Sequence, residues 1–445
     1  MGTAYTSIIG DASALFYNPA ATAFLSGTQL QMDSLVVVGS FRFKPSETPP
    51  GTVVPEKGFS GAIRPRVIPV GNLYFVHALS PKWTLGFGSF TPFGLSDNFT
   101  NFRDDDPANT KYPGRFAGTR GRLEVIWMQP TVAYRLSRNS SVGVGVALVH
   151  THLFLEQSFL NPLDDGLDFG REVAAEALPG VDKEQAARFL ARLLPEGRSR
   201  VAGTANSPGF SLSYLYRHVK SSTNIGLMFR SAVTHHLKGE AAFAFTKSYP
   251  LEKFVGSDLL PKAFPNQPVT GSFTTPGTFA LGISNSSHWN TTLSMDVRMQ
   301  DYRRFRSVAL NFSQTRATNP DVRTPAEKRL VFDFADAYAL AFGAEKRLSP
   351  ITQVRLGYMY DHSPVIDKSV GPLFPDTNRH SFTFGASRKW RSFDLTLFYQ
   401  AVKFAHRDVN VAANSNQFTN GRYDNFAHIA GLGFCWGKQS EEERR

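Results

Sequence analysis

The chain has 445 residues, of which 42% are hydrophobic, and its mean hydropathy is -0.22. No run approaches the roughly 18 consecutive apolar residues of a membrane-spanning helix, so composition excludes helical spanning of a bilayer. The formal net charge of +11 comes from scattered basic residues, which argues against nucleic acid as a partner. The single cysteine, Cys435, excludes a disulfide framework and a multi-cysteine zinc site.

The first 27 residues are too rich in small residues and too interrupted to form a spanning strand. Residues 1–10 also lack the basic and apolar regions of a secretory signal peptide. A protein that must cross an inner membrane needs such a segment, so we interpret the chain as processed, or as truncated inside its N-terminal region. Residues 28–437 show no linker or break in composition and are expected to form one large domain, followed by a polar tail at 438–445.

Within this domain, apolar and polar residues alternate in one run after another. Because side chains on a strand point to opposite faces in turn, each such run predicts a strand with one apolar and one polar face. The clearest run has Leu293, Met295, Val297 and Met299 on one face and Ser294, Asp296, Arg298 and Gln300 on the other. Each run is about 9 to 11 residues long, which is the length of a tilted strand that crosses the hydrocarbon layer. The pattern predicts a transmembrane β-barrel in the outer membrane of a Gram-negative-type envelope.

The runs predict 14 antiparallel strands joined alternately by short and long connections. The predicted strands are 28–45, 64–80, 82–95, 121–137, 140–158, 206–218, 222–241, 274–287, 289–304, 329–347, 351–367, 378–390, 392–407 and 423–437. The long connections are 46–63, 96–120, 159–205, 242–273, 305–328, 368–377 and 408–422. This alternation is typical of an up-and-down barrel with tight periplasmic turns and large outer loops, and an even number of strands places both chain ends on the periplasmic side.

Two of the long connections are unusual. Residues 166–196 are rich in Ala, Leu, Glu and Arg at helical spacing, and they predict two short helices broken by Pro179 and Gly180. The connection at 242–273 is strongly apolar. Exposed apolar loops indicate a binding surface, so the sequence predicts a groove for a hydrophobic ligand, although packing of the two loops against each other would explain the same pattern. The residues assigned to this groove are Phe189, Leu193, Phe243, Phe245 and Phe254.

Aromatic and basic residues suggest contacts with the membrane. Many rings lie near predicted strand ends, where they would form belts at the two interfaces, or else belong to an ordinary core. They include Tyr74, Phe75, Trp83, Trp127, Trp289, Trp390 and Trp436. Arg303, Arg304 and Arg306 are the densest basic group; they would either meet lipopolysaccharide phosphates or form a solvated strand end.

The chain resembles the FadL family of outer-membrane transporters for long-chain fatty acids and other hydrophobic compounds. Asp11, Ala12 and Ser13, followed by Asn18, Pro19 and Ala20, are similar to the N-terminal hatch motif of that family. The segment LEVIWMQPTVAYRLSRNSSVGVGV at 123–146 resembles the fourth and fifth strands, and FADAYALAFGAEKRLSPITQVRLGYMYDHSPV at 334–365 resembles the tenth and eleventh. Pro375, Asp376 and Arg379 resemble the start of the twelfth strand, so the likeness extends over essentially the full chain.

The resemblance implies a 14-stranded barrel plugged by a hatch at residues 1–27. It implies hatch and gating roles for Asp11, Ser13, Asn18, Pro19 and Ala20. It also implies that substrate leaves sideways through a gap at a kink in the third strand, where Pro92, Phe93 and Gly94 stand. Independently of the family, proline cannot donate a ladder hydrogen bond and glycine weakens a strand, so pairing should fail here, with an ordinary bulge as the alternative.

The function predicted is passive uptake of long-chain fatty acids or similar hydrophobic molecules by a protein that is not an enzyme, uses no cofactor or metal and acts as a monomer. Arg355 and Arg379 are candidates for gripping a carboxylate. Alternatives are an aromatic-hydrocarbon transporter of the same barrel type, a general diffusion porin, a barrel enzyme and a soluble ligand binder. The histidines at 150, 152, 235, 236 and 362 belong to no motif that ties them to a serine nucleophile, which argues against the enzyme.

Overall fold

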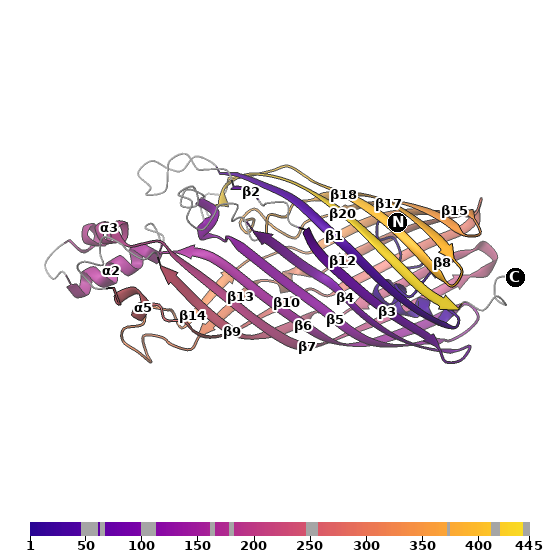
Figure 1. Cartoon of the computed structure of the whole chain (residues 1–445), viewed down its shortest axis with the longest axis horizontal. Helices are drawn as coiled ribbons and strands as arrows, with labels where there is room; N and C mark the ends of the chain where they lie inside the picture. Colours follow the sequence, from indigo (N-terminus) through magenta and orange to yellow (C-terminus); the bar gives the residue numbers. More distant parts are fainter. Residues whose placement is uncertain are drawn as a thin grey trace.

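The computed structural model describes residues 1–45, 61–62, 67–98, 113–160, 165–177, 182–245, 257–371, 374–410 and 419–438. They form a closed antiparallel barrel, because β1 (Thr28–Pro45) pairs with both β3 (Val67–Ala78) and β20 (Gly421–Lys438). Figure 1 shows the barrel from the side, with the helices α2 and α3 beyond one end. No helix among the described residues is both long and apolar enough to span a membrane.

Twenty strand segments make up the fourteen barrel strands, because some barrel strands consist of two segments in line. For example, β8 (Thr223–Arg230) and β9 (Val233–Phe245) both pair with β7 (Gly197–His218), at residues 211–218 and 197–204 of that strand. The remaining segments are β2 (Gly61–Ala62), β4 (Trp83–Asn98), β5 (Arg120–Arg135), β6 (Ser140–Phe159), β7 (Gly197–His218), β8 (Thr223–Arg230), β9 (Val233–Phe245), β10 (Gln267–Thr275), β11 (Thr278–His288), β12 (Thr291–Gln300), β13 (Ser307–Phe312), β14 (Glu327–Val331), β15 (Ala337–Ser349), β16 (Thr352–Asp361), β17 (Arg379–Trp390), β18 (Phe393–Phe404) and β19 (Arg407–Val409).

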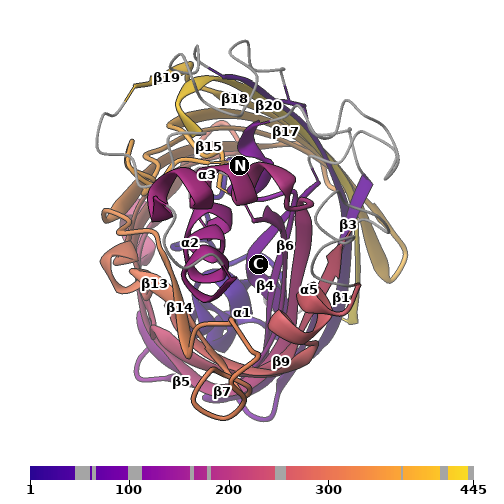
Figure 2. The ribbon, with the colours of Figure 1, turned by 90° about the vertical axis from the view of Figure 1, so that its left-hand side faces the viewer.

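The helices lie at two levels of the barrel. Inside it are α1 (Ala14–Tyr17) and the 3-10 turn η1 (Pro19–Phe24), and Figure 2 shows α1 within the ring of strands. The helices α2 (Asp165–Ala177), α3 (Lys183–Leu193) and α5 (Leu259–Ala263) gather at the outer mouth (Figure 2). Further 3-10 turns are η3 (Pro113–Phe116), η4 (Val219–Ser221) and η5 (Tyr302–Arg304).

Alternation along the strands sets the two surfaces of the wall, as the sequence predicts. On β6, Val146 and Leu148 are 62% and 51% exposed, whereas Ala147 and Val149 are 4% and 0% exposed. The outward side chains are apolar because hydrocarbon is their solvent, and the inward ones pack on the contents of the barrel. The predicted transmembrane barrel is therefore confirmed.

Several predicted boundaries differ from the structure. The sixth barrel strand begins at Gly197 instead of 206, because the weakly patterned residues 197–205 pair with β6 and β9 on both sides. The ninth strand does not end at 304: it breaks at η5 and continues as β13, so the predicted connection at 305–328 is shorter. Neighbouring strands supply hydrogen-bonding edges that local sequence patterns do not reveal.

Two aromatic residues assigned to the interface belts face the interior. Trp127 is 1% exposed and Tyr74 is 3% exposed, and both belong to the main apolar cluster. The belt prediction was wrong for these two rings, because their neighbours on the same strands already occupy the lipid face. Trp83, Trp289, Trp390 and Trp436 are between 42% and 89% exposed, as expected of a belt.

Candidate functional site

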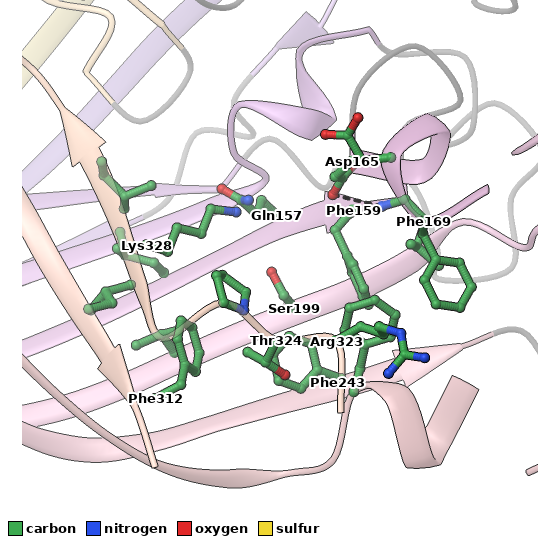
Figure 3. A pocket seen from close by; sticks show the side chains of 18 of the residues that line it. Gln157, Phe159, Asp165, Phe169, Ser199, Phe243, Phe312, Arg323, Thr324 and Lys328 are labelled. Atoms are coloured by element: carbon green, nitrogen blue, oxygen red, sulfur yellow. Dashed lines mark hydrogen bonds between the residues drawn. The ribbon is translucent and has the colours of Figure 1, made fainter. Parts of the chain in front are cut away.

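An apolar cavity of about 330 Å³ lies at the outer mouth of the barrel. Its volume falls within the range of small-molecule sites. Figure 3 shows Phe159, Phe169, Phe243 and Phe312 around it, contributed by β6, α2, β9 and β13. Further apolar lining residues include Leu155, Val201, Leu310 and Leu330.

The ring of Phe159 organises the aromatic side of this cavity. It lies 5.5, 5.4 and 5.1 Å from the rings of Phe243, Phe245 and Phe264, measured between centroids. Edge-to-face contacts at these distances are favourable beyond simple burial of area. Helices α2 and α3 cover the group with Phe169, Ala186 and Leu190, so the helical loop and the apolar loop form one apolar cluster.

Charged side chains stand at the rim of the cavity. The Arg323 guanidinium is 2.9 Å from Glu172 and 3.1 Å from Glu176, which ties α2 to the segment before β14. Lys328 also lines the cavity (Figure 3), and no carboxylate of the described residues forms an ion pair with it. The cavity therefore offers an apolar interior with one uncompensated cation at its edge.

The N-terminal segment is fixed inside the barrel by buried hydrogen bonds. Asn18 is fully buried; its Nδ2 donates to the carbonyls of Thr6 and Tyr214 at 2.7 and 3.1 Å, and its Oδ1 accepts from the Ala20 amide at 3.1 Å. The Ala20 amide also donates to Ser213 Oγ at 2.8 Å. One asparagine thus links two parts of the hatch to the barrel wall.

Glycines in the wall allow the hatch to approach this closely. A Cβ at position 226 would lie 2.1 Å from the Thr6 carbonyl oxygen, and one at position 143 would lie 2.5 Å from the Ala20 nitrogen. Only a residue without a side chain fits at either place. Pro19 starts η1, a position that suits its restricted φ and its missing N–H, and Asp11 accepts from the Ser13 amide at 3.0 Å.

The third barrel strand carries an irregularity at the predicted kink. Its pairing with β5 shifts register between Phe90 and Phe93. It pairs with β3 from the pair Ala78–Thr84 to the pair Leu73–Ser89. Beyond that point, among the described strands, β3 pairs only with β1 and β4 pairs only with β5. The pairing between these neighbours therefore ends at Ser89, three residues before Pro92.

Apolar packing is continuous from the outer cavity to this irregularity. Leu310, which lines the cavity, belongs to the same cluster as Phe305, Phe332 and Phe334 deeper in the barrel. Phe93 packs against that cluster. A hydrophobic molecule would meet apolar side chains all along this path.

Not every residue assigned to the groove lies there. Phe243 lines the cavity, and Phe245 and Leu193 pack beside it in the outer cluster, whereas Phe189 points outward and is 63% exposed. Phe254 lies outside the described residues. The period of an amphipathic helix assigns Phe189 to the apolar stripe, but α3 turns its Ala186 and Leu190 toward α2 instead.

The two candidate arginines hold ion pairs away from the cavity. Arg355 lies 2.6 Å from Glu345, and Arg379 lies 2.5 and 2.6 Å from Asp361 and Asp376. Arg303 and Arg304 of the basic group likewise bind Asp336 and Asp301, which leaves contact with lipopolysaccharide a prediction. Paired arginines of this kind have little capacity left for another carboxylate.

Sequence reasoning missed the residues at the centre of the cavity. Phe159 ends β6 and Phe169 lies in the second turn of α2, so neither stands out from the local sequence pattern. Arg323 and Lys328 lie in or beside a connection far along the chain. The one signal in sequence is alternation: Lys328 lies two positions from both Ala326 and Leu330, so it shares a strand face with apolar residues.

Comparisons with known proteins agree with this architecture. A family model described as outer membrane protein transport protein (OMPP1/FadL/TodX) matches residues 1–436. A putative outer membrane protein of Neisseria meningitidis is 24% identical over 96% of this chain and 89% of its own length, and the long-chain fatty acid transport protein of Escherichia coli O157:H7 is 24% identical over 80% and 77%.

Solved structures share the fold. A Pseudomonas aeruginosa FadL homologue superposes with a TM-score of 0.75 at 16% identity, covering 98% of this chain and 96% of that one. The Pseudomonas putida toluene transporter TodX superposes with a TM-score of 0.66 at 16% identity, covering 98% of both chains. The closed antiparallel barrel is therefore the fold that this chain shares with them.

Proposed function

Because the chain belongs to the outer membrane protein transport protein family (OMPP1/FadL/TodX), whose members are outer-membrane transporters of hydrophobic compounds, we propose that it takes up long-chain fatty acids or similar molecules passively. Fold and family are those of transport channels and not of enzymes. One closed barrel contains the cavity, the hatch and the interrupted ladder, so a monomer suffices for the route proposed here.

The observation that carries the proposal is the apolar path from the outer cavity to the place where β3 and β4 stop pairing. Ligand is captured in the cavity around Phe159 and Phe243, passes the aromatic cluster at Phe305 and Phe334, and leaves sideways beside Phe93. Burying each methylene is worth about 0.8 kcal/mol, so a dozen would hold a ligand by roughly 10 kcal/mol before the cost of ordering it.

Release is therefore the demanding step, and the hatch is the element placed to control it. It is joined to the wall by polar contacts and not by covalent bonds, and those of Asn18 and Ala20 are short. Movement of the hatch would reshape the inner end of the path, and consumption of the ligand inside the cell would give uptake its direction. The sequence contains no nucleotide-binding motif, in keeping with passive transport.

Uptake into cells tests the proposal. Cells that lack their own transporter of this type, and that express the chain, should accumulate radiolabelled palmitate faster than cells with an empty vector. Planar bilayers containing the purified protein should show little small-ion conductance, because the hatch fills the lumen. Uptake of toluene but not palmitate would favour the aromatic-hydrocarbon alternative, and a large open conductance would favour a general porin.

A further inference from the structure

Arg230, the last residue of β8, is a buried cation in an aromatic enclosure inside the barrel. Its side chain is 4% exposed. The guanidinium carbon lies 4.6 Å from the ring centroid of Phe16, 5.1 Å from that of Phe90 and 5.4 Å from that of Trp127. Three π-faces around one guanidinium offset part of the cost of removing it from water.

Hydrogen bonding of this guanidinium is incomplete. Nη2 donates to the carbonyl oxygen of Phe16 at 2.6 Å, while Nε is buried without an acceptor. Within the described parts of the chain, no carboxylate forms an ion pair with Arg230. A buried charge without a counter-ion is expensive, so its retention calls for an anion that is bound at some stage.

The position of Arg230 connects the hatch with the interrupted ladder. Phe16 belongs to α1 of the hatch, and Phe90 is the residue at which β4 begins to shift its register against β5. The ring of Phe90 lies 5.1 Å from that of Phe16 and is stacked 6.5 Å from that of Trp127. An anion that reaches Arg230 must therefore arrive between the hatch and the inner side of the proposed exit.

We propose that Arg230 is the inner counter-ion for the carboxylate of an amphiphilic ligand and determines specificity for acids over uncharged compounds. This inference rests on the proposed function, since it concerns a ligand already inside the barrel. The carboxylate accepts hydrogen bonds from the guanidinium, including its free Nε, and replaces the Phe16 carbonyl as the acceptor of Nη2. Binding thereby releases α1 from the wall at the point where the ligand is to leave.

The test compares a charged ligand with its uncharged ester. The full chain in a non-ionic detergent, and in cells for uptake, is given palmitate and methyl palmitate. Arg230→Met removes the charge and keeps an apolar side chain of similar length. The ratio of palmitate to methyl palmitate affinity should fall by about ten- to a hundredfold, as expected for losing a charge-assisted hydrogen bond in a buried site. Partitioning into micelles is common to all variants and cancels in this ratio.

Arg135→Met is the matched control. Arg135 also donates to a hatch carbonyl, that of Ala23, at 3.0 and 3.2 Å, and its guanidinium also stacks on a hatch ring, Phe24, at 4.8 Å. It shares the anchoring role of Arg230 but is not enclosed, so its replacement should leave the ratio unchanged. Arg230→Lys keeps the charge and should retain most of the preference for palmitate.

The outcomes separate this inference from the proposed function. If the wild-type protein takes up neither compound, the proposed function fails. If it takes up both and Arg230→Met leaves the ratio as it was, the proposed function stands and the role of Arg230 is refuted. The same refutation follows if Arg135→Met lowers the ratio as much, because anchoring of the hatch would then explain the effect. Heat-modifiable migration in electrophoresis verifies that each variant is folded.

Discussion

The ring of Phe93 meets the ring of Tyr302 edge-on, with 6.3 Å between their centroids. This contact joins the irregular part of β4 to η5, the break between β12 and β13 on another part of the wall. Phe93 therefore points into the barrel, and the next residue, Gly94, is exposed on the outside. The place where β3 and β4 cease to pair is closed from within by aromatic rings and lacks a side chain on its outer face.

Replacing Gly94 by tryptophan should block uptake and leave folding intact. The nearest atoms to a Cβ at this position are 3.6 and 4.0 Å away, so the new side chain meets no clash at its base and stands in the proposed exit. We expect palmitate uptake to fall to the level of cells with an empty vector. Uptake is measured with radiolabelled palmitate and normalised to folded protein in the outer membrane.

Two controls accompany this variant. Gly94→Ala leaves the opening clear and should retain uptake. Phe87→Trp enlarges a side chain on the same outward face, where β4 is still paired with Phe75 of β3, and should also retain it. Normal uptake by Gly94→Trp would reject the lateral route.

Filling the outer cavity should weaken capture of the ligand. Val201 of β7 lines the cavity next to Leu155, and a tryptophan there would occupy the space of about two methylenes of ligand or more. Losing two methylenes of burial costs about 1.6 kcal/mol, so uptake at low palmitate concentration should fall by about tenfold. Raising the palmitate concentration should restore much of the rate.

Ala202→Trp serves as the comparison, because side chains of adjacent residues on a strand point to opposite faces. Its uptake should follow the wild type at every concentration. Equal effects of the two variants would mean that the cavity is not the capture site.

Replacing Asn18 by alanine should loosen the hatch. The change removes the donor to the Thr6 and Tyr214 carbonyls and the acceptor of the Ala20 amide, all in a buried place. Leaving a buried polar group unsatisfied costs about 1–3 kcal/mol, so the free energy of unfolding in lipid vesicles should fall by about that amount. Small-ion conductance in planar bilayers should rise as the hatch moves more freely.

Asn139→Ala tests whether this effect is special to the hatch. Asn139 also donates to a wall carbonyl, that of Arg217 at 2.9 Å, but in an exposed turn. Asn139→Ala should therefore change neither the small-ion conductance nor the free energy of unfolding appreciably. A conductance of Asn18→Ala equal to that of the wild type would argue that the hatch does not control the lumen.

The connection after β18 should respond to pH near neutrality. Hydrogen bonds to Asp424 and Asp408, each at 2.8 Å from a ring nitrogen, raise the pKa of His406 above its usual value of 6.5. A raised pKa means that the contribution of His406 to stability is fully present below the unfolded value of about 6.5 and is lost as pH rises through the folded value. Amide exchange in the turn before β19, corrected for its intrinsic pH dependence, should therefore accelerate above neutrality.

Titration of isotope-labelled histidine by NMR checks the cause directly. Asp424→Asn removes the carboxylate with the larger effect and should return the pKa of His406 toward its usual value, with a smaller change in Asp408→Asn. An unaltered titration in Asp424→Asn would show that this carboxylate does not hold the proton on His406.

The wall of the barrel was predictable because each of its strands obeys a local rule. Val146 and Leu148 face lipid and Ala147 and Val149 face inward, as their alternation requires. The same alternation already assigns Trp127 to the inner face, since Ile126 and Met128 lie on the other, and the belt prediction for Trp127 failed by ignoring it. The position of a ring near a strand end carries less information than its place in the pattern.

The sites are formed by residues far apart in the chain, so local sequence patterns could predict only some of their residues. Phe159 meets Phe264, and Arg230 meets Phe16, across more than one hundred and more than two hundred residues respectively. Arg355 and Arg379 stand out in sequence as inward cations but bind Glu345 and Asp361. Alternation also places Arg230 on the inner face, but nothing local indicates that no carboxylate among the described residues pairs with it. Whether a charge is paired depends on what the closed barrel brings to it.

The sequence by itself determined that this is an outer-membrane barrel and which face of each strand meets lipid, because both follow from a two-residue period and the thickness of a bilayer. It also determined that the N-terminus is not part of the wall, because residues 1–27 are rich in small residues. Only the tertiary structure decided where the cavity lies, where the ladder of β3 and β4 stops, and that Arg230 is enclosed by aromatic rings with no carboxylate partner among the described residues. Closing a sheet on itself brings together side chains from strands with no fixed spacing in sequence, and contacts of that kind are set by register and packing across the barrel and not by neighbours along the chain.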